Sequence, residues 1–172
     1  MDLRMPDDEI VVLFASMSGT AEMVADEIGA RLESFGLPHR VVGMQKASEK
    51  MLERRTTFII CSSTYGNGDV PDAGVPFYDL LTTARPDLSH VRYGVVALGD
   101  MTYSASFCGS GVKFDDAFAD LGAHRLLPLL EHDSRSGTFP EDAALVWLDD
   151  WLTAYREHST CAATDSRLHR AN

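Results

Sequence analysis

The residues best suited to chemistry begin with a short loop that follows the first apolar run of the chain. This loop consists of Ser16, Met17, Ser18, Gly19, Thr20 and Ala21. Its hydroxyl groups lie just before a helical pattern, so free backbone N–H groups at a helix N-terminus would face the same point. The loop contains no lysine or arginine and lacks the GxxxxGK[ST] pattern of nucleotide P-loops. It therefore favours a cradle for one phosphate monoester, although serine and threonine would also act as simple helix caps.

Two later loops combine small residues with aromatic side chains. The second loop, residues 62–72, contains Tyr65 among turn-forming residues, and the third, residues 98–109, contains Tyr103 and Phe107. Aromatic residues on two loops at one edge can enclose a flat ring and gain stacking energy and apolar burial. A single tyrosine is more often a packed surface residue. The three loops in this order favour a site for a flat ligand that carries a phosphate.

The elements that would position these loops alternate between buried strands and amphipathic helices. Continuous apolar runs predict strands at residues 10–15, 39–42, 57–61, 93–98 and 124–130. Helical spacing predicts helices at residues 21–35, 75–84 and 111–121 and after Pro140, with a weak crossover at residues 44–52. This alternation predicts an α/β fold, a doubly wound parallel sheet with helices on both faces. Ligands of such sheets bind beyond the carboxyl ends of the strands, which is where all three loops lie.

Composition narrows the class of protein. The formal net charge of −11 disfavours binding to nucleic acid, and leaves open either simple solubility or steering towards a basic protein partner. No apolar run reaches the roughly 18 residues that a membrane span needs, and no export signal is visible. Cys61, Cys108 and Cys161 form no CxxC pair, which favours free thiols in the cytoplasm over disulfides or a metal site. We expect an N-terminal extension at residues 1–8, one domain at 9–158 and a disordered tail at 159–172.

Three segments of the chain resemble the flavodoxin family. They are SMSGTAE, SSTYGNGDVPD, and ALGDMTY with the following FCGSGVKFDDAFADLGAHRLL. The likeness covers about residues 9–156 and is greatest to MioC-type short-chain flavodoxins and to the FMN domains of sulfite reductase flavoprotein and cytochrome P450 reductase. It implies a flavodoxin-like five-stranded parallel sheet in the order 2-1-3-4-5, non-covalently bound FMN and electron transfer by a monomer.

The resemblance also implies a role for each loop. The first would bind the FMN phosphate, the second would line one face of the ring and the third would cover the other. In relatives the phenylalanine of the third loop follows the tyrosine by three positions, whereas here Phe107 follows Tyr103 by four. This extra residue could displace the ring of Tyr103. Gly66 would allow a peptide flip towards the ring. Besides the first loop, the implied set comprises Ser63, Thr64, Tyr65, Gly66, Asn67, Gly68, Leu98, Gly99, Asp100, Tyr103, Phe107, Cys108, Gly109 and Asp133.

The implied partners are an NADPH-flavoprotein reductase as electron donor and a redox enzyme as acceptor, both with basic docking faces. Three alternatives remain open at this point. One is an FMN-dependent NAD(P)H:quinone reductase on the same fold, although GxGxxG is absent. Another is a phosphoacceptor receiver domain, although Ser16 stands where paired acids would be needed. The last is a flavodoxin fold that binds only proteins.

Overall fold

The structure, a computed structural model, describes residues 9–168, with side chains described as far as Ser159. Its sheet contains β1 (Ile10–Ala15), β2 (His39–Gly43), β3 (Thr57–Ser62), β4 (Arg92–Gly99), β5 (His124–Arg125) and β6 (Leu130–Asp133). The strands are parallel in the order β2-β1-β3-β4-β5, and β6 also pairs with β4. The predicted fold class and strand order are confirmed.

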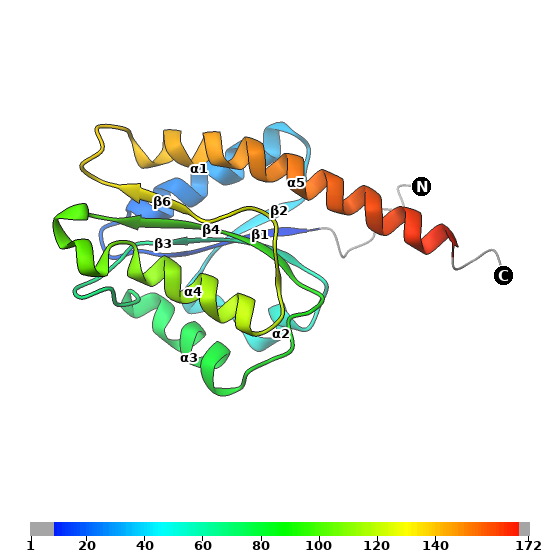
Figure 1. The fold of residues 1–172 in the computed structure, drawn as a ribbon, viewed down its shortest axis with the longest axis horizontal. Coiled ribbons are helices and arrows are strands. Elements are labelled where there is room, and N and C mark those ends of the chain that lie inside the picture. Colours follow the sequence, from blue (N-terminus) through cyan, green and yellow to red (C-terminus); the bar gives the residue numbers. More distant parts are fainter. Residues whose placement is uncertain (1–8, 169–172) are drawn as a thin grey trace.

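Helices cover both faces of this sheet (Figure 1). The helices are α1 (Thr20–Ser34), α2 (Glu49–Leu52), α3 (Val75–Thr83), α4 (Gly109–Asp120) and α5 (Pro140–Leu168). Helices α1 and α5 pack on one face, and α3 and α4 pack on the other. No helix in the described part of the chain is long and apolar enough to cross a membrane.

The central strands β1, β3 and β4 are mostly apolar because each of their faces belongs to a core. In β1, Val11 and Leu13 belong to the core beneath α3 and α4, whereas Ile10 and Val12 belong to the core beneath α1 and α5. Successive side chains of a strand point to opposite faces, so a sheet covered on both sides needs apolar residues at every position. Trp151 is buried in the second of these cores.

The fifth strand differs from the expected single strand at residues 124–130. It divides into β5 and β6, which pair with β4 on either side of a break. Arg125 pairs with Tyr93 and Leu130 pairs with Val96, so the fifth strand uses five residue steps where β4 uses three. Pro128 lies in the interruption, where the pairing stops because proline has no N–H to donate to β4. Its carbonyl instead accepts a hydrogen bond from Trp147 Nε1 of α5 at 3.0 Å. The strand then resumes as β6 and ends at Asp133, whereas the sequence predicts Asp133 after the end of the strand.

Helix α5 extends past residue 158, where the sequence placed the end of the domain. It runs to Leu168 and so passes through the first part of the stretch 159–172 for which a disordered tail was expected. Ser159 links this part of the helix to the sheet, because its hydroxyl accepts a hydrogen bond from Arg92 at 3.1 Å. The expected N-terminal extension, residues 1–8, lies outside the described residues, as do residues 169–172.

Candidate functional site

The first loop is organised around the hydroxyl group of Ser16. Ser16 Oγ accepts hydrogen bonds from the backbone N–H groups of Gly19, at 2.9 Å, and Ala21, at 3.3 Å. Gly19 adopts φ +89°, a conformation that favours glycine, and it is the N-cap of α1. The Ser18 and Thr20 hydroxyls lie 3.3 Å apart beside the first turn, whose N–H groups have no acceptor within the helix. The turn thus collects hydroxyl and N–H donors without a cation.

The second loop forms a tight hairpin with Tyr65 at its base. Tyr65 and Asp69 exchange two backbone hydrogen bonds of 2.9 and 2.7 Å, and Gly66 and Gly68 between them both have positive φ. The Thr64 hydroxyl donates to the Leu98 carbonyl at 2.9 Å, which joins the hairpin to the end of β4. The side chain of Tyr65 remains 50% exposed.

The third loop begins with a short 3-10 helix, Met101–Ser106, that is interrupted at Tyr103. Tyr103 has φ −104° and ψ 62°, which are not helical, and its side chain is 65% exposed. Hydrogen bonding from Thr102 lowers the pKa of the Asp100 carboxyl below its ordinary value, so Asp100 stays ionised at neutral pH.

Cys108, which the sequence placed on the ring face, is fully buried beneath the third loop. Its thiol lies 3.4 Å from the Ala97 carbonyl and 3.8 Å from that of His132. Burial, assisted by the charge of Glu131, raises the pKa of this thiol to about 12. The side chain of Cys108 therefore packs against the sheet and supports the loop from below.

Asp133 acts as a clamp between β6 and the third loop. Its Oδ1 accepts hydrogen bonds from the backbone N–H groups of Met101 and Arg135, each at 3.0 Å. The Arg135 guanidinium in turn donates to the Thr102 hydroxyl at 3.2 Å. The sequence indicated an acid near the ring at this position, but did not reveal that it holds the third loop in place.

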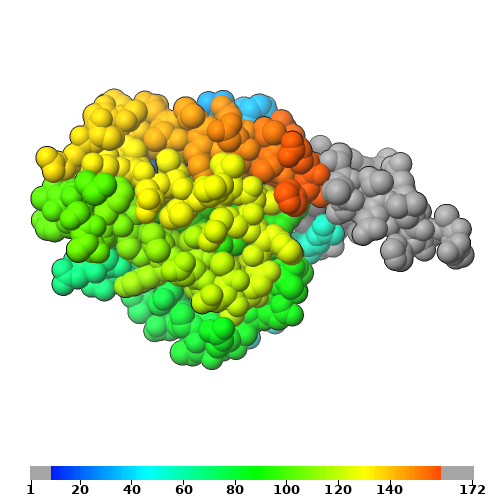
Figure 2. All heavy atoms as spheres, viewed as in Figure 1, coloured from blue at the N-terminus to red at the C-terminus, as the bar shows by residue number. Residues whose placement is uncertain are grey.

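The second and third loops enclose a cavity of about 360 Å³. It is lined by Thr64, Gly66, Asn67, Asp100, Tyr103, Ser106 and Phe107. Tyr103 and Phe107 both line it, despite the extra residue between them. In Figure 2 the third loop, in green, forms one end of the molecule together with the gold segment that joins β6 to α5.

A second, more apolar hollow of about 300 Å³ lies between the end of β4 and the first loop. It includes Thr20 of the first loop, Leu98 and Gly99 at the end of β4, and Phe139 before α5. Leu98 and Gly99, at the start of the third loop, thus line one hollow together with Thr20 of the first loop. This arrangement would suit a ligand whose phosphate and ring lie at opposite ends.

Two contacts that support the site could not be identified from the sequence. Ser62 at the end of β3 and Ser110 in α4 share a buried hydrogen bond of 2.6 Å. Gly68 and Gly109 pack backbone to backbone, because a Cβ added to Gly109 would lie 2.8 Å from the Gly68 Cα. The glycines in GNGD and FCGSG were the only signal for the second contact, and nothing in the sequence pointed to the first.

The edge that carries the three loops is rich in acids. Asp69, Asp100, Glu131 and Asp133 lie on or beside the second and third loops, and Lys113 pairs with Asp69 at 3.6 Å. No group of three His, Cys, Asp or Glu side chains in the described part of the chain could hold a metal ion. The arrangement has the parts to bind a phosphate and a flat ring, and an acidic rim around them.

Comparison with known proteins identifies the family. The family model described as Flavodoxin matches residues 12–147. Protein MioC of Escherichia coli K12 is 32% identical over 149 residues, which cover 84% of this chain and 96% of MioC. The sulfite reductase [NADPH] flavoprotein alpha-component of Bacillus subtilis is 34% identical over 150 residues, which cover 87% of this chain but only 24% of that protein. This chain therefore spans about a quarter of the length of that relative.

A solved structure agrees with these matches. A flavodoxin from Pseudomonas aeruginosa with one cysteine replaced by serine superposes with a TM-score of 0.76 at 31% identity, over 85% of this chain and 97% of that chain. Its fold matches the parallel sheet described above, and its length is close to that of the domain. Together with the three loops at one edge, these matches show that the chain belongs to the flavodoxin family of FMN-binding electron-transfer proteins.

Proposed function

We propose that the three loops hold one FMN non-covalently and that the chain carries electrons from an NADPH-dependent flavoprotein reductase to a redox enzyme. The observation that carries this proposal is the convergence of the loops. A cation-free cradle lies at the start of α1, and an aromatic-lined cavity lies between the second and third loops. FMN, when bound, supplies the redox chemistry, and the protein supplies binding, orientation and electrostatics.

The first loop fits a phosphate monoester. Ser18 and Thr20 place hydroxyl groups beside the N-terminus of α1, where the helix dipole and the free N–H groups attract an anion. Gly19 has nothing within 4 Å of an added Cβ, so its surroundings are open to a ligand. The Ser16 hydroxyl holds the turn from inside through its two hydrogen bonds.

The second and third loops fit the ring. Thr64, Gly66 and Asn67 line one side of the cavity, and Asp100, Tyr103 and Phe107 line the other. Tyr65 and Tyr103 are both large and at least half exposed, and a ring against them would bury apolar surface and add stacking. We therefore assign the ring to this cavity, with Tyr103 of the lining against one face. Tyr65 does not line the cavity, but it lies between the lining residues Thr64 and Gly66 in the chain, and we assign it to the other face.

The acidic rim supports a partner with a basic docking face. Asp69 and Asp100 lie on the second and third loops themselves, so a docking partner would meet their charges next to the ring. Opposite charges on two proteins raise the rate of their encounter, and salt screens this effect. The relatives described above lend no support to the quinone reductase alternative.

A reconstituted electron-transfer assay tests the proposal. FMN should bind the apoprotein with one-to-one stoichiometry, and riboflavin, which lacks the phosphate, should bind far more weakly. NADPH alone should leave the FMN-loaded protein oxidised. Adding a basic NADPH-flavoprotein reductase should reduce it at a rate that falls steeply from low to physiological salt.

Each component of the proposal can fail separately in this assay. Equal affinities for FMN and riboflavin would contradict the phosphate cradle. Steady-state oxidation of NADPH by the isolated protein would indicate an enzyme. Reduction rates that do not change with salt would show that the acidic rim does not steer partners.

A further inference from the structure

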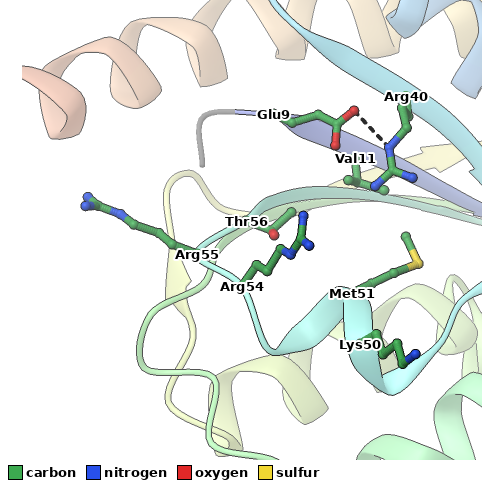
Figure 3. Close-up of a pocket in the computed structure, with 8 residues that line it drawn as sticks. All are labelled: Glu9, Val11, Arg40, Lys50, Met51, Arg54, Arg55 and Thr56. Carbon is green, nitrogen blue, oxygen red and sulfur yellow. Dashed lines mark ion pairs between the residues drawn. The ribbon is translucent and has the colours of Figure 1, made fainter. Parts of the chain in front are cut away.

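A third pocket lies at the end of the sheet opposite to the flavin site, with a volume of about 190 Å³ (Figure 3). Its walls come from residues at the amino ends of three strands. Glu9 precedes β1, Arg40 lies in β2, and Arg54 and Thr56 lie between α2 and β3. Because the strands are parallel, these amino ends and the three flavin loops lie at opposite ends of the sheet.

The charge of this pocket is opposite to that of the whole chain. Arg40, Lys50, Arg54 and Arg55 line it, four of the 15 lysines and arginines in a protein of net charge −11. Glu9 is the one acid in the lining, and its Oε1 pairs with Arg40 Nε at 2.8 Å. Within the described part of the chain, no ion pair joins the other three cations to an acid. Cations gathered in this way repel one another unless an anion lies between them.

Arg40 and Arg54 are arranged to face a shared ligand. Figure 3 shows Arg40 and Arg54 extending towards one another from opposite walls, with Thr56 beside Arg54, whereas Arg55 points away. The bond to Glu9 uses the Nε of Arg40, one of the five N–H donors of a guanidinium. Two arginine forks and a hydroxyl match the oxygens of a phosphate group, which arginine binds in a bidentate manner.

We propose that this pocket is an anion site for a small molecule that carries a phosphate group, either a single phosphate or the end of a polyphosphate. It is independent of the flavin site and of the function proposed above. The concave shape and small volume favour a phosphate group over a flat acidic surface of another protein. The pocket also differs from the flavin cradle in its chemistry, because its donors are charged and those of the first loop are neutral.

Nuclear magnetic resonance of the FMN-loaded protein can test the site directly, since FMN, whose phosphate we assign to the first loop, would remove that loop as a competing anion site. Inorganic phosphate and pyrophosphate would be titrated separately while backbone amide shifts are followed. We expect saturable shifts around Val11, Arg40 and Thr56, with no matching shifts in the three flavin loops. Tighter binding of pyrophosphate would assign the site to polyphosphates, and equal binding would assign it to a single phosphate. The absence of saturable shifts with either probe would overturn the proposal.

Three variants make the assignment specific, because two of them should weaken binding of the probe and the third should tighten it. Arg40→Gln and Arg54→Gln should each weaken binding of the probe about tenfold or more, because a charge-assisted contact is lost. Glu9→Gln should tighten binding, because it removes the acid that competes for Arg40. Arg31→Gln is the matched control, since Arg31 lies in α1 and pairs with Asp149 at 3.6 Å, away from the pocket. Unchanged affinity in Arg54→Gln, or weaker binding in Glu9→Gln, would contradict the site.

Discussion

Replacing Gly109 with alanine should separate the two loops that enclose the ring cavity. Gly109 is the first residue of α4, directly after the third loop, and it packs on Gly68 in the second loop. A Cβ at Gly109 would lie 2.8 Å from the Gly68 Cα and 3.0 Å from the Gly68 carbonyl oxygen. Real Cβ atoms do not approach backbone atoms this closely, so one of the two loops must move.

The size of the effect follows from what the added methyl group meets. Both close atoms belong to backbone, so no side chain can rotate away to relieve the contact. Overpacking of this kind costs about 1–3 kcal/mol. Because the displaced loops line the cavity, we expect the cost to appear largely in FMN binding, as a rise in Kd of roughly 5- to 150-fold.

The assay is a fluorescence titration of apoprotein with FMN, together with thermal unfolding of the apoprotein. Gly94→Ala is the matched control, because a Cβ there would lie in the core, within 2.7 Å of Trp147 and Trp151 and away from the loops. The control should lose stability and keep its affinity for FMN. An unchanged Kd in Gly109→Ala, or equal losses of affinity in both variants, would refute the role of the Gly68–Gly109 contact in shaping the site.

Three further predictions concern the cradle, the ring faces and the response to pH. Thr20→Asp should weaken FMN binding by several kcal/mol, because the new carboxylate repels the phosphate, and should leave riboflavin binding nearly unchanged. Equal losses of affinity for both ligands would contradict the phosphate cradle. Tyr65→Ala and Tyr103→Ala should each weaken FMN binding and shift the midpoint potentials, with about 0.5–1.5 kcal/mol lost from stacking in addition to the lost burial. An unchanged dissociation constant and unchanged potentials in either variant would show that its tyrosine does not contact the ring. The free energy of unfolding should fall as pH rises above the ordinary thiol pKa of 9.0. Burial raises the pKa values of Cys61 and Cys108 in the folded state, so above this pH the unfolded chain binds fewer protons than the folded chain. Denaturant unfolding at pH 8 and 10 measures this loss, which should shrink when Cys61 is replaced by alanine.

The sequence predicted those features that depend on local patterns. The strand β1 and the helix α1 follow from a change of apolar period around Gly19, and the loop between them follows from its hydroxyl residues. The meeting of three loops at one edge follows from the rule that parallel strands of one sheet share their carboxyl ends. No knowledge of contacts was needed for either.

The features that the sequence did not predict depend on contacts between distant residues. At the break in the fifth strand, the Pro128 carbonyl accepts a hydrogen bond from Trp147 of α5, a contact that no local pattern indicates. The clamp by Asp133 needs a partner on the third loop, 32 positions earlier. Cys108 has the same neighbours in sequence whether it faces the ring or the core, and only its contacts with two carbonyls show that it faces the core.

The basic pocket gave no signal in the sequence for a related reason. Glu9, Arg40 and Arg54 belong to three separate segments, and the net charge of −11 directs attention to the acids. Parallel pairing of β1 with β2 and β3 brings these segments together at the amino ends of the strands. A site of this kind becomes visible only when the sheet order and the side-chain positions are known.

An anaerobic redox titration of the FMN-loaded protein, followed by absorption spectroscopy, tests the central claim most directly. A carrier of single electrons should take up its two electrons in two steps with separate midpoint potentials, and NADPH should reduce it only when a reductase is present. Uptake of both electrons in a single step, together with direct reduction by NADPH, would contradict the assignment of this chain as an electron carrier.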